Sequence, residues 1–408
     1  MATLTDPPAE SFKLSMLVYD TRYRAITFQI IALVVFLTFI GWLINNTAQN
    51  LADLGKEPSF GFLWDPAGYD INQKLIEYNN QMPHFRAAMV GLLNTLLVAF
   101  LGCVTATIVG VIVGVLRLSN NWLVARIMTV YVEMFRNVPV LMWIVLAMAI
   151  LIESLPAPNA FRGENPEASM SLFGSVAITN RGVYVPGIDF TRSVGALDWV
   201  IVLAVLAASI FAITRIRASA DAKQEATGLR PKTGLLQAAV FVLPTLIVML
   251  ILGASLNIPE LKGFNFQGGV YMRNSLIALW LALSLYTAAF IAENVRAGIL
   301  AISKGQTEAA AALGLRPRRI MSLVILPQAL RVIIPPLISQ YLNLTKNSSL
   351  AIAVGYMDIT GTLMGITLNQ TGRELETVLL GMLVYLVISL AISAAMNVYN
   401  NSVKLVER

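Results

Sequence analysis

The sequence is nearly free of the residues that build disulfide frameworks and metal centres. Its 408 residues include one cysteine, Cys103, and one histidine, His84. One cysteine excludes a disulfide within the chain, and these two residues are too few for a zinc site. We expect His84, which follows Pro83, to be a solvated residue. No Ser-His-Asp arrangement or pair of carboxylates indicates an enzyme, so no catalytic residue is predicted.

Charge is also scarce. Asp, Glu, Lys and Arg make up 13% of the chain and hydrophobic residues 57%, whereas soluble proteins carry about 25% charged residues. This composition is that of a membrane protein. The net charge of +6 comes from basic residues in loops and not from one soluble face, so we do not expect nucleic-acid binding.

A phosphate-binding loop of the form G-x-x-x-x-G-K-[ST] is missing. The nearest stretch, "GLRPKT" at Gly228–Thr233, has a proline where the second glycine must let the backbone approach a phosphate. The chain is therefore not expected to hydrolyse ATP in the usual way, and no cofactor is expected to bind to it.

What the sequence has in abundance is long apolar runs. Crossing about 30 Å of hydrocarbon takes about 20 helical residues, and we predict an all-α polytopic membrane protein. The first run, Ala25 to Ile44, is too long for a signal peptide and predicts a retained span. The eight predicted spans are 26–45, 87–116, 123–152, 199–214, 235–253, 275–300, 331–354 and 376–399.

Lys and Arg residues predict the orientation of these spans. Most of the 29 basic residues fall in the segments that are cytoplasmic when both termini are inside, as the positive-inside rule requires. We accordingly divide the chain into a cytoplasmic tail (1–25), a first span with a periplasmic segment (26–85), a transmembrane domain (86–400) and a cytoplasmic tail (401–408). Within the domain, segment 153–262 is an insertion with two further spans.

The first predicted periplasmic segment contains "FLWDPAGYDINQKLIEY". Asp65 before Pro66 is typical of a helix start, and Ile71, Leu75 and Ile76 can share one helical face. We predict a short helix lying on the outer membrane surface, with an ordinary loop as the alternative.

One polar stretch lies between two apolar ones: "GQTEAAAALGLRPRRIMSLVILPQ", from Gly305 to Gln328. We predict a short helix from Gln306 to Leu313, because its residues are good helix formers. Glu308 is predicted in the first turn, where a carboxylate suits the helix dipole, and Gly314 is predicted to end the helix. Pro327 should break the chain before the next span. The alanines keep this helix thin enough to dock in a groove of another protein.

This spacing, E-A-A, three residues, Gly and about twelve residues to Leu-Pro, resembles the EAA motif of permease subunits of bacterial ABC importers. The resemblance implies that the helix docks into a cytoplasmic ATPase and transmits its movement. It assigns ATPase coupling to Gly305, Gln306, Glu308, Ala309, Ala310, Gly314 and Arg316.

Four further stretches are similar to the polar amino acid permeases: Gly91–Ser119, Tyr131–Leu141, Leu285–Ala310 and Lys346–Gly355. Short permeases of this kind have five spans, the type I importer core. The present chain adds one span at the N-terminus and two in 153–262. That layout resembles the permeases of general L-amino acid transporters, which work as an unequal pair.

The resemblance implies a complex in the bacterial inner membrane that imports an amino acid by alternating access. Its other parts would be two copies of an ATPase, which hold ATP and magnesium, a second homologous permease and a periplasmic binding protein. An ion-coupled secondary carrier is the alternative function, and a membrane scaffold is another. A carrier would have no use for an EAA helix and often shows inverted repeats, which the sequence lacks.

Charged residues inside spans cost at least ~2.5 kcal/mol at the bilayer centre, so each needs a reason. Glu293 and Arg296 are three residues apart and can pair on one helical face. Glu133 and Arg136 have the same spacing. We predict that both are structural or gating ion pairs.

Lys346 is a further charged residue predicted within a span. Pro335 and Pro336 should interrupt the entry of the seventh span, so that regular helix runs from Leu337 to Val354 and places Lys346 near mid-membrane. Four polar residues then fall on one helical face. We call them the polar stripe: Ser339, Asn343, Lys346 and Asn347.

The polar stripe must face protein or a water-filled path. Lys346 can bind the carboxylate of an amino acid, or it can pair with a carboxylate such as Glu293 and carry nothing; both alternatives remain open. Thr95 can also satisfy its hydroxyl on the preceding helical turn. The candidate substrate path comprises Asn343, Lys346, Asn347, Ser348, Ser349, Asn94 and Thr95.

Overall fold

The computed structural model describes residues 15–55, 58–163, 165–193, 195 and 197–403. The predicted tails 1–25 and 401–408 lie partly outside these residues. The chain forms two compact units, residues 1–63 and residues 64–408, which we call unit 1 and unit 2.

Unit 1 is built around one long helix. A short α1 (Met16–Tyr19) precedes α2 (Thr21–Asp53), and a short 3-10 turn, Gly61–Trp64, follows at the boundary with unit 2. None of the most apolar window of α2 is buried. A helix that exposes apolar side chains along its whole length is suited to lipid, and α2 contains the predicted first span.

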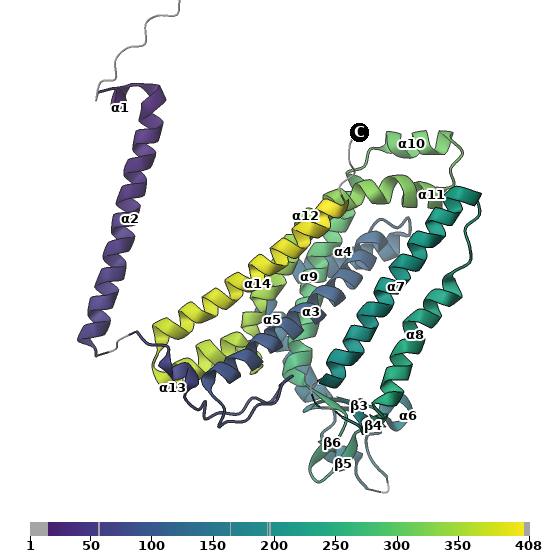
Figure 1. The fold of residues 1–408 in the computed structure, drawn as a ribbon, viewed down its shortest axis with the longest axis horizontal. Helices are drawn as coiled ribbons and strands as arrows, with labels where there is room; N and C mark the ends of the chain where they lie inside the picture. Colours follow the sequence, from purple (N-terminus) through teal and green to yellow (C-terminus); the bar gives the residue numbers. More distant parts are fainter. Residues whose placement is uncertain (1–14, 56–57, 164, 194, 196, 404–408) are drawn as a thin grey trace, which may run out of the picture. The chain divides into compact units, whose positions relative to one another are not determined.

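Unit 2 is organised around α9 (Asn274–Leu300), of whose most apolar window 72% is buried. Around α9 pack α3 (His84–Leu116), α4 (Trp122–Asn137), α5 (Val140–Ser154) and α12 (Leu326–Asn347). The last long helix, α14 (Glu374–Val403), packs against α12 (Figure 1).

Glycines let α3 approach α9 closely. A Cβ atom placed on Gly110 would lie 2.7 Å from the Cβ of Ile291, and one on Gly114 would lie 2.7 Å from the carbonyl oxygen of Ala292. Small residues at such positions bring helices close enough for extensive van der Waals contact, which is the main attraction between helices in lipid.

The predicted third span, 123–152, is two helices that meet at a bend of 107°. Pro139 lacks an amide hydrogen and disfavours helical backbone at the preceding residue, and Val138 is extended, with φ −107° and ψ 133°. Among the described residues, seven helices are long and apolar enough to cross a membrane, or up to eight if this bent pair is one span.

Three prolines do not break the chain where we predicted. α11 (Pro317–Ile320) continues through a π-helical turn, Met321–Ile325, into α12, which begins just before Pro327 and runs through Pro335 and Pro336. Helices in membranes tolerate proline because neighbouring groups and local π adjustments satisfy the freed carbonyls.

Helix α12 ends at Asn347 and not at Val354. The residues that follow, Ser348–Val354, form a 3-10 helix, which ends at Gly355 in the left-handed region. A π-helical segment, Thr360–Thr367, and α13 (Leu368–Thr371) then lead to α14.

The insertion and the segment after it add short strands that we did not predict. β1 (Ala177–Thr179), β2 (Gly182–Val185) and β7 (Val270–Arg273) form one antiparallel sheet; β3 (Gly187–Phe190) pairs with β4 (Ala254–Asn257), and β5 (Glu260–Lys262) with β6 (Asn265–Gln267). Two single turns, Pro158–Phe161 and α6 (Ser171–Gly174), precede them. The strands gather at one end of unit 2, which we call the strand end (Figure 1).

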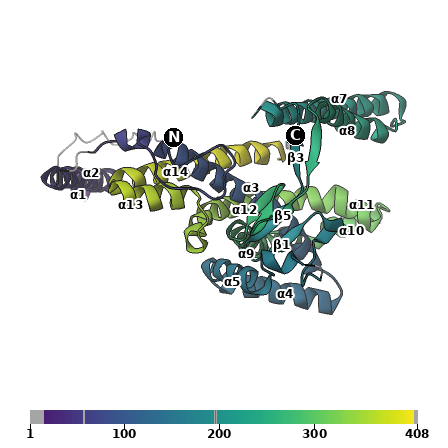
Figure 2. The same ribbon diagram turned by 90° about the horizontal axis from the view of Figure 1, so that it is seen from below.

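The insertion also carries a helical hairpin of α7 (Leu197–Thr227) and α8 (Gly234–Ile251). The two helices pack on each other, and the chain enters and leaves them through β3 and β4. Figure 2 shows the hairpin separated from α9, with β3 beside it.

Segment 65–83 is not the predicted surface helix. It is irregular, and its own side chains Tyr69, Ile71 and Tyr78 are buried. Ile71 is thus part of the core, although the segment that carries it is not helical. Burial raises the pKa of Tyr69 to about 12, so its hydroxyl keeps the proton with which it bonds.

His84 is not solvated as predicted, because it is 3% exposed. Its Nδ1 lies 3.0 Å from the hydroxyl of Thr367, which belongs to the segment before α13. This contact joins the start of α3 to the π-helical segment Thr360–Thr367, far along the sequence. His84 is therefore a structural residue of the core.

Candidate functional site

The predicted polar helix is α10 (Lys304–Ala312), which connects α9 with α11. It lies at the end of unit 2 opposite the strands (Figure 1), and Ala310 is its one buried residue. Because the helix begins at Lys304 and not at Gln306, Glu308 stands in the second turn and not in the first. Glu308 is the middle residue of this nine-residue helix, so the predicted support from the helix dipole, which falls off within the first turn, is not available to it.

Gly314 ends α10 as predicted. It adopts a φ of +76°, and the amides of Gly314 and Leu315 donate to the carbonyls of Ala311 and Ala310. This pair of bonds is the Schellman arrangement, which favours glycine at the left-handed position. The end of α10 is therefore sharply defined.

The surface around α10 exposes both a large apolar side chain and several arginines. Leu313 is 82% exposed, and the exposed Arg316, Arg318 and Arg319 follow within two turns. In the part of the chain that the structure describes, no ion pair involves these three arginines. An apolar tip beside unpaired guanidinium groups is suited to contact with another protein.

The polar stripe lies on the outer face of α12 with respect to unit 2. Ser339, Asn343 and Lys346 are exposed and Asn347 is half-buried, whereas Leu344 on the opposite side is fully buried. The predicted helical spacing is confirmed. The stripe faces away from the buried side of α12, and its Lys346 also borders α14 of this chain.

Lys346 does not pair with Glu293. Among the described residues, Glu293 is bound by Arg117 and by Arg296, at 2.7 Å, and no ion pair involves Lys346. The alternative in which Glu293 neutralises Lys346 is thus wrong for this conformation. Glu293 of α9 thus bonds to Arg117, the residue that directly follows α3. The predicted pair with Arg296 is confirmed as part of a three-residue cluster.

The second predicted pair is not formed. Glu133 accepts a hydrogen bond from Asn137 at 3.3 Å, and the guanidinium of Arg136 lies over the ring of Phe290, 5.5 Å from its centroid. The described residues contain no ion pair between Glu133 and Arg136. Arg136 therefore links α4 to α9 through a cation–π contact.

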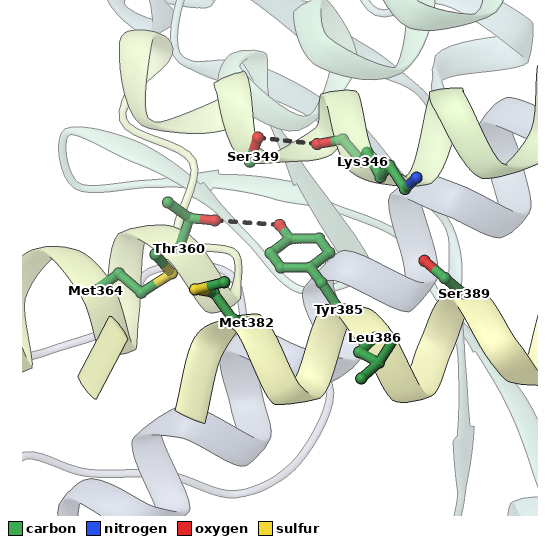
Figure 3. Close-up of a pocket in the computed structure, with 8 residues that line it drawn as sticks. All are labelled: Lys346, Ser349, Thr360, Met364, Met382, Tyr385, Leu386 and Ser389. Carbon is green, nitrogen blue, oxygen red and sulfur yellow. Dashed lines mark hydrogen bonds between the residues drawn. The ribbon is translucent and has the colours of Figure 1, made fainter. Parts of the chain in front are cut away.

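Lys346 lines a cavity of about 570 Å³ between α12 and α14. Lys346 and Ser349 form one wall, Thr360 and Met364 a second, and α14 the third (Figure 3). The side chains from α14 are Met382, Tyr385, Leu386 and Ser389. A mostly apolar cavity with one ammonium and a few hydroxyl groups can hold a small solute that carries a carboxylate.

Sequence reasoning missed the residues opposite Lys346. Tyr385 donates to the carboxylate of Asp358 at 3.0 Å and lies 3.1 Å from the hydroxyl of Thr360. Asp358, fully buried, also accepts from the amide of Gly361 at 2.9 Å. One signal was available, because Asp358 is the single acidic residue between Glu308 and Glu374, and acidic residues in apolar stretches need a structural or functional role.

Asn94 and Thr95 are buried in unit 2 and not on the wall that Lys346 lines. The side-chain Nδ2 of Asn94 donates to the backbone carbonyls of Gln73 at 2.7 Å and Met357 at 2.9 Å. The hydroxyl of Thr95 donates to Gly91 and accepts from the amide of Ile359. Both side chains fasten α3 to the segments around it.

The two serines after Asn347 differ in exposure. Ser348 is buried and donates to the carbonyl of Thr345, and Ser349 donates to the carbonyl of Lys346, both at 2.8 Å. Ser349 lines the cavity and Ser348 does not. Of the predicted path residues, the structure brings Lys346 and Ser349 together on one cavity.

Known proteins resemble the chain over its whole length. Residues 236–405 match the family model of the binding-protein-dependent transport system inner membrane component. The chain is 58% identical to the glutamate/glutamine/aspartate/asparagine transport system permease protein BztB of Rhodobacter capsulatus, with 100% of both chains covered.

Two further relatives agree. The chain is 44% identical to the general L-amino acid transport system permease protein AapQ of Rhizobium johnstonii, over 98% of this chain and 96% of that one. It is 43% identical to the putative amino-acid ABC transporter permease protein YhdX of Escherichia coli, over 94% and 95%. With α10 and its glycine-terminated end, this similarity shows that the chain belongs to the family of amino acid ABC transporter permeases, among its long members.

Proposed function

We propose that this chain is the membrane-embedded permease subunit of an ATP-driven importer, and that it moves L-amino acids into the cytoplasm by alternating access. The substrates named for the relative at 58% identity are glutamate, glutamine, aspartate and asparagine, and we propose amino acids of this class for the present chain. Two ATPase subunits, a second permease and a periplasmic binding protein complete the complex.

The observation that carries this proposal is α10. It is an exposed helix with one buried residue, and it is held between two helices of the core, α9 and α12, through α11. A push on α10 therefore reaches both helices. The coupling residues are those of the helix and its end: Gly305, Gln306, Glu308, Ala309, Ala310, Gly314 and Arg316.

The orientation follows from the same helix. ATPases are cytoplasmic, so the α10 end is the cytoplasmic side and the strand end is the periplasmic side. Lys223, Arg230 and Lys232 at the turn of the α7–α8 hairpin then fall on the cytoplasmic side, as the positive-inside rule requires. Both termini are proposed to be cytoplasmic in the bacterial inner membrane.

The solute path is proposed to run along the polar stripe. A second permease that packs against the outer face of α12 would enclose Asn343, Lys346 and Asn347 in a water-filled space, where their polar groups stay hydrated. Lys346 would meet the substrate carboxylate there. The cavity of Lys346 and Tyr385 lies at the edge of this path.

The chain offers a matched test of coupling, because "GLRP" occurs twice. Gly314 and Gly228 have φ values of +76° and +72°, and a Cβ atom added to either would meet no described neighbour within 4 Å. Gly314→Val should lower amino acid uptake and substrate-stimulated ATP hydrolysis about tenfold in the reconstituted complex, because a side chain at left-handed φ costs about 1–2 kcal/mol. Gly228→Val bears the same strain away from α10 and should change both rates less than about twofold.

Equal losses in the two variants would contradict the role of α10, since they would trace the effect to backbone strain alone. Copurification of the ATPase with each variant completes the measurement. A Gly314→Val complex that keeps its ATPase but hydrolyses ATP without transport would place the defect in transmission.

A further inference from the structure

A second cavity, of about 610 Å³, lies at the strand end of unit 2. Its walls come from the turn between β1 and β2, from β7 and the first residues of α9, and from the ends of α5 and of the 3-10 helix Ser348–Val354. The insertion thus meets the transmembrane core at this cavity. Its size is that of pockets that hold small ligands.

The charge of the cavity is of one sign. Arg181 and Arg273 line it, and none of its lining residues is acidic. Arg181 donates to the carbonyl of Phe264 at 3.2 Å, which leaves most of its N–H groups free. No ion pair involves either arginine among the described residues. Two guanidinium groups without a carboxylate favour a ligand that supplies one.

Three residues that line the cavity carry buried acceptor atoms that lack donors within the described chain. Asn274, 2% exposed, turns its amide nitrogen to the carbonyl of Asn180 at 2.7 Å, which leaves its Oδ1 unpaired. The Oδ1 of Asn180 and the Oγ of Ser275, 5% exposed, are also buried there without a hydrogen-bond partner. Unsatisfied buried polar atoms are rare because each costs about 1–3 kcal/mol.

Donors and acceptors are therefore paired in the way that a zwitterion requires. The arginines suit a carboxylate, and the N-terminus of α9, which no side chain caps, adds a favourable dipole. The side-chain Oδ1 atoms of Asn180 and Asn274 suit an ammonium group. The hydroxyl of Ser275 can donate to the carboxylate or accept from the ammonium.

We propose that this cavity is a binding site for a free α-amino acid, separate from the Lys346 cavity. Its carboxylate lies between Arg181 and Arg273, and its ammonium lies at the Oδ1 atoms of Asn180 and Asn274. This inference rests on the proposed function, which makes the strand end periplasmic. The site then receives the solute before the solute enters the membrane. Asn180 and Arg181 belong to the insertion, which thereby acquires a role in substrate entry.

The test is equilibrium binding to the purified permease complex in nanodiscs without the binding protein. The probes are radiolabelled L-glutamate, L-glutamine, L-aspartate and L-asparagine, each measured separately. Binding of at least one probe should weaken about tenfold or more when Arg273→Gln is introduced, both in the parent and in a Lys346→Met background. Arg192→Gln, which changes an exposed arginine of the strand end that bonds to Ile251, is the matched control and should bind like the parent.

Ser275→Ala separates a binding role from a structural one. The hydroxyl of Ser275 has no partner in the described chain, so its removal should leave the melting temperature unchanged or higher and still weaken binding severalfold. The α-amides of L-glutamine and L-asparagine, which have no carboxylate, should not compete with a bound probe. Unchanged binding in both Arg273→Gln and Ser275→Ala would overturn the proposal, as would equal competition by these amides.

A failure of the entry site can be distinguished from a failure of the proposed function. If Arg273→Gln and Ser275→Ala both bind normally while Gly314→Val lowers ATP-driven uptake about tenfold, the entry site is wrong and the importer stands. If the arginine variant loses binding while the reconstituted parent complex shows no ATP-driven uptake, the site stands and the importer is wrong.

Discussion

Helices α9 and α8 are nearly equal in hydropathy and opposite in burial. Their most apolar windows have mean hydropathies of 2.0 and 2.4, yet 72% of that window is buried in α9 and none in α8. Hydropathy therefore identifies both as spans without telling which one is the core. The difference lies in what each helix offers to its neighbours.

Helix α9 offers small side chains where other helices cross it. Ala288, Ala289 and Ala292 are fully buried, and glycines of α3 lie opposite this stretch. Helix α8 instead exposes Leu243, Leu246 and Leu250. Because lipid is as apolar as leucine, close packing of small residues decides which helices associate.

A third helix shows that exposure has two meanings. The hairpin of α7 and α8 exposes apolar side chains over its membrane-spanning part, which suits lipid, whereas α12 exposes the polar stripe, which does not. A polar face in the membrane requires protein or water beside it. The chemistry of the exposed face thus distinguishes a lipid contact from the proposed solute path.

The largest effect is expected where α3 and α9 touch. Gly114→Leu places a side chain against the backbone of Ala292 and should destabilise the subunit by about 3 kcal/mol or more through overpacking. We expect little folded protein in the membrane, as measured by size-exclusion chromatography of a fluorescent fusion. Gly41→Leu in α2 is the matched control, because no described atom lies within 4 Å of its Cβ position. Similar folded yields would show that α9 does not form the tightly packed core.

A smaller and selective effect is expected at the polar stripe. Lys346→Met should lower uptake of acidic amino acids about tenfold, which corresponds to about 1.4 kcal/mol, in complexes that assemble normally. Lys346 forms no ion pair within the described residues, so the loss would not come from a broken bridge. Lys346→Arg keeps the charge and should restore part of the uptake. Normal uptake by Lys346→Met would remove this residue from the path.

These contrasts also explain what could be predicted from the sequence. Apolar length and the end of α10 are local properties, and Gly314 and the Glu293–Arg296 pair were predicted correctly, whereas the start of α10 was predicted two residues too late. His84 was not, because its partner Thr367 lies 283 residues away. The strands were missed because each has three or four residues, although Asn180-Arg181-Gly182 between apolar residues is a hairpin signal.

The candidate cavities were harder to predict for the same reason. Lys346 and Tyr385 lie on different helices, and only packing of α12 against α14 brings them to one space. The bend at Pro139 was available in the sequence, since proline also constrains the residue before it. It was missed because apolar residues predominate on both sides, although Arg136 and Asn137 directly precede Val138.

The smallest effect is expected within the hairpin. Gln237 of α8 accepts from Arg217 of α7 at 3.1 Å, and the bond is exposed at the α10 end of the hairpin, so Gln237→Leu should cost no more than about 1 kcal/mol. We expect an almost unchanged melting temperature and uptake within about twofold of the parent complex. A collapse comparable to that of Gly114→Leu would show instead that α7 and α8 fold cooperatively with α9 in the assembled complex. In that case the exposed leucines of α8 would be covered by protein and not by lipid, and the opposite burial of the two helices would be a property of the isolated chain.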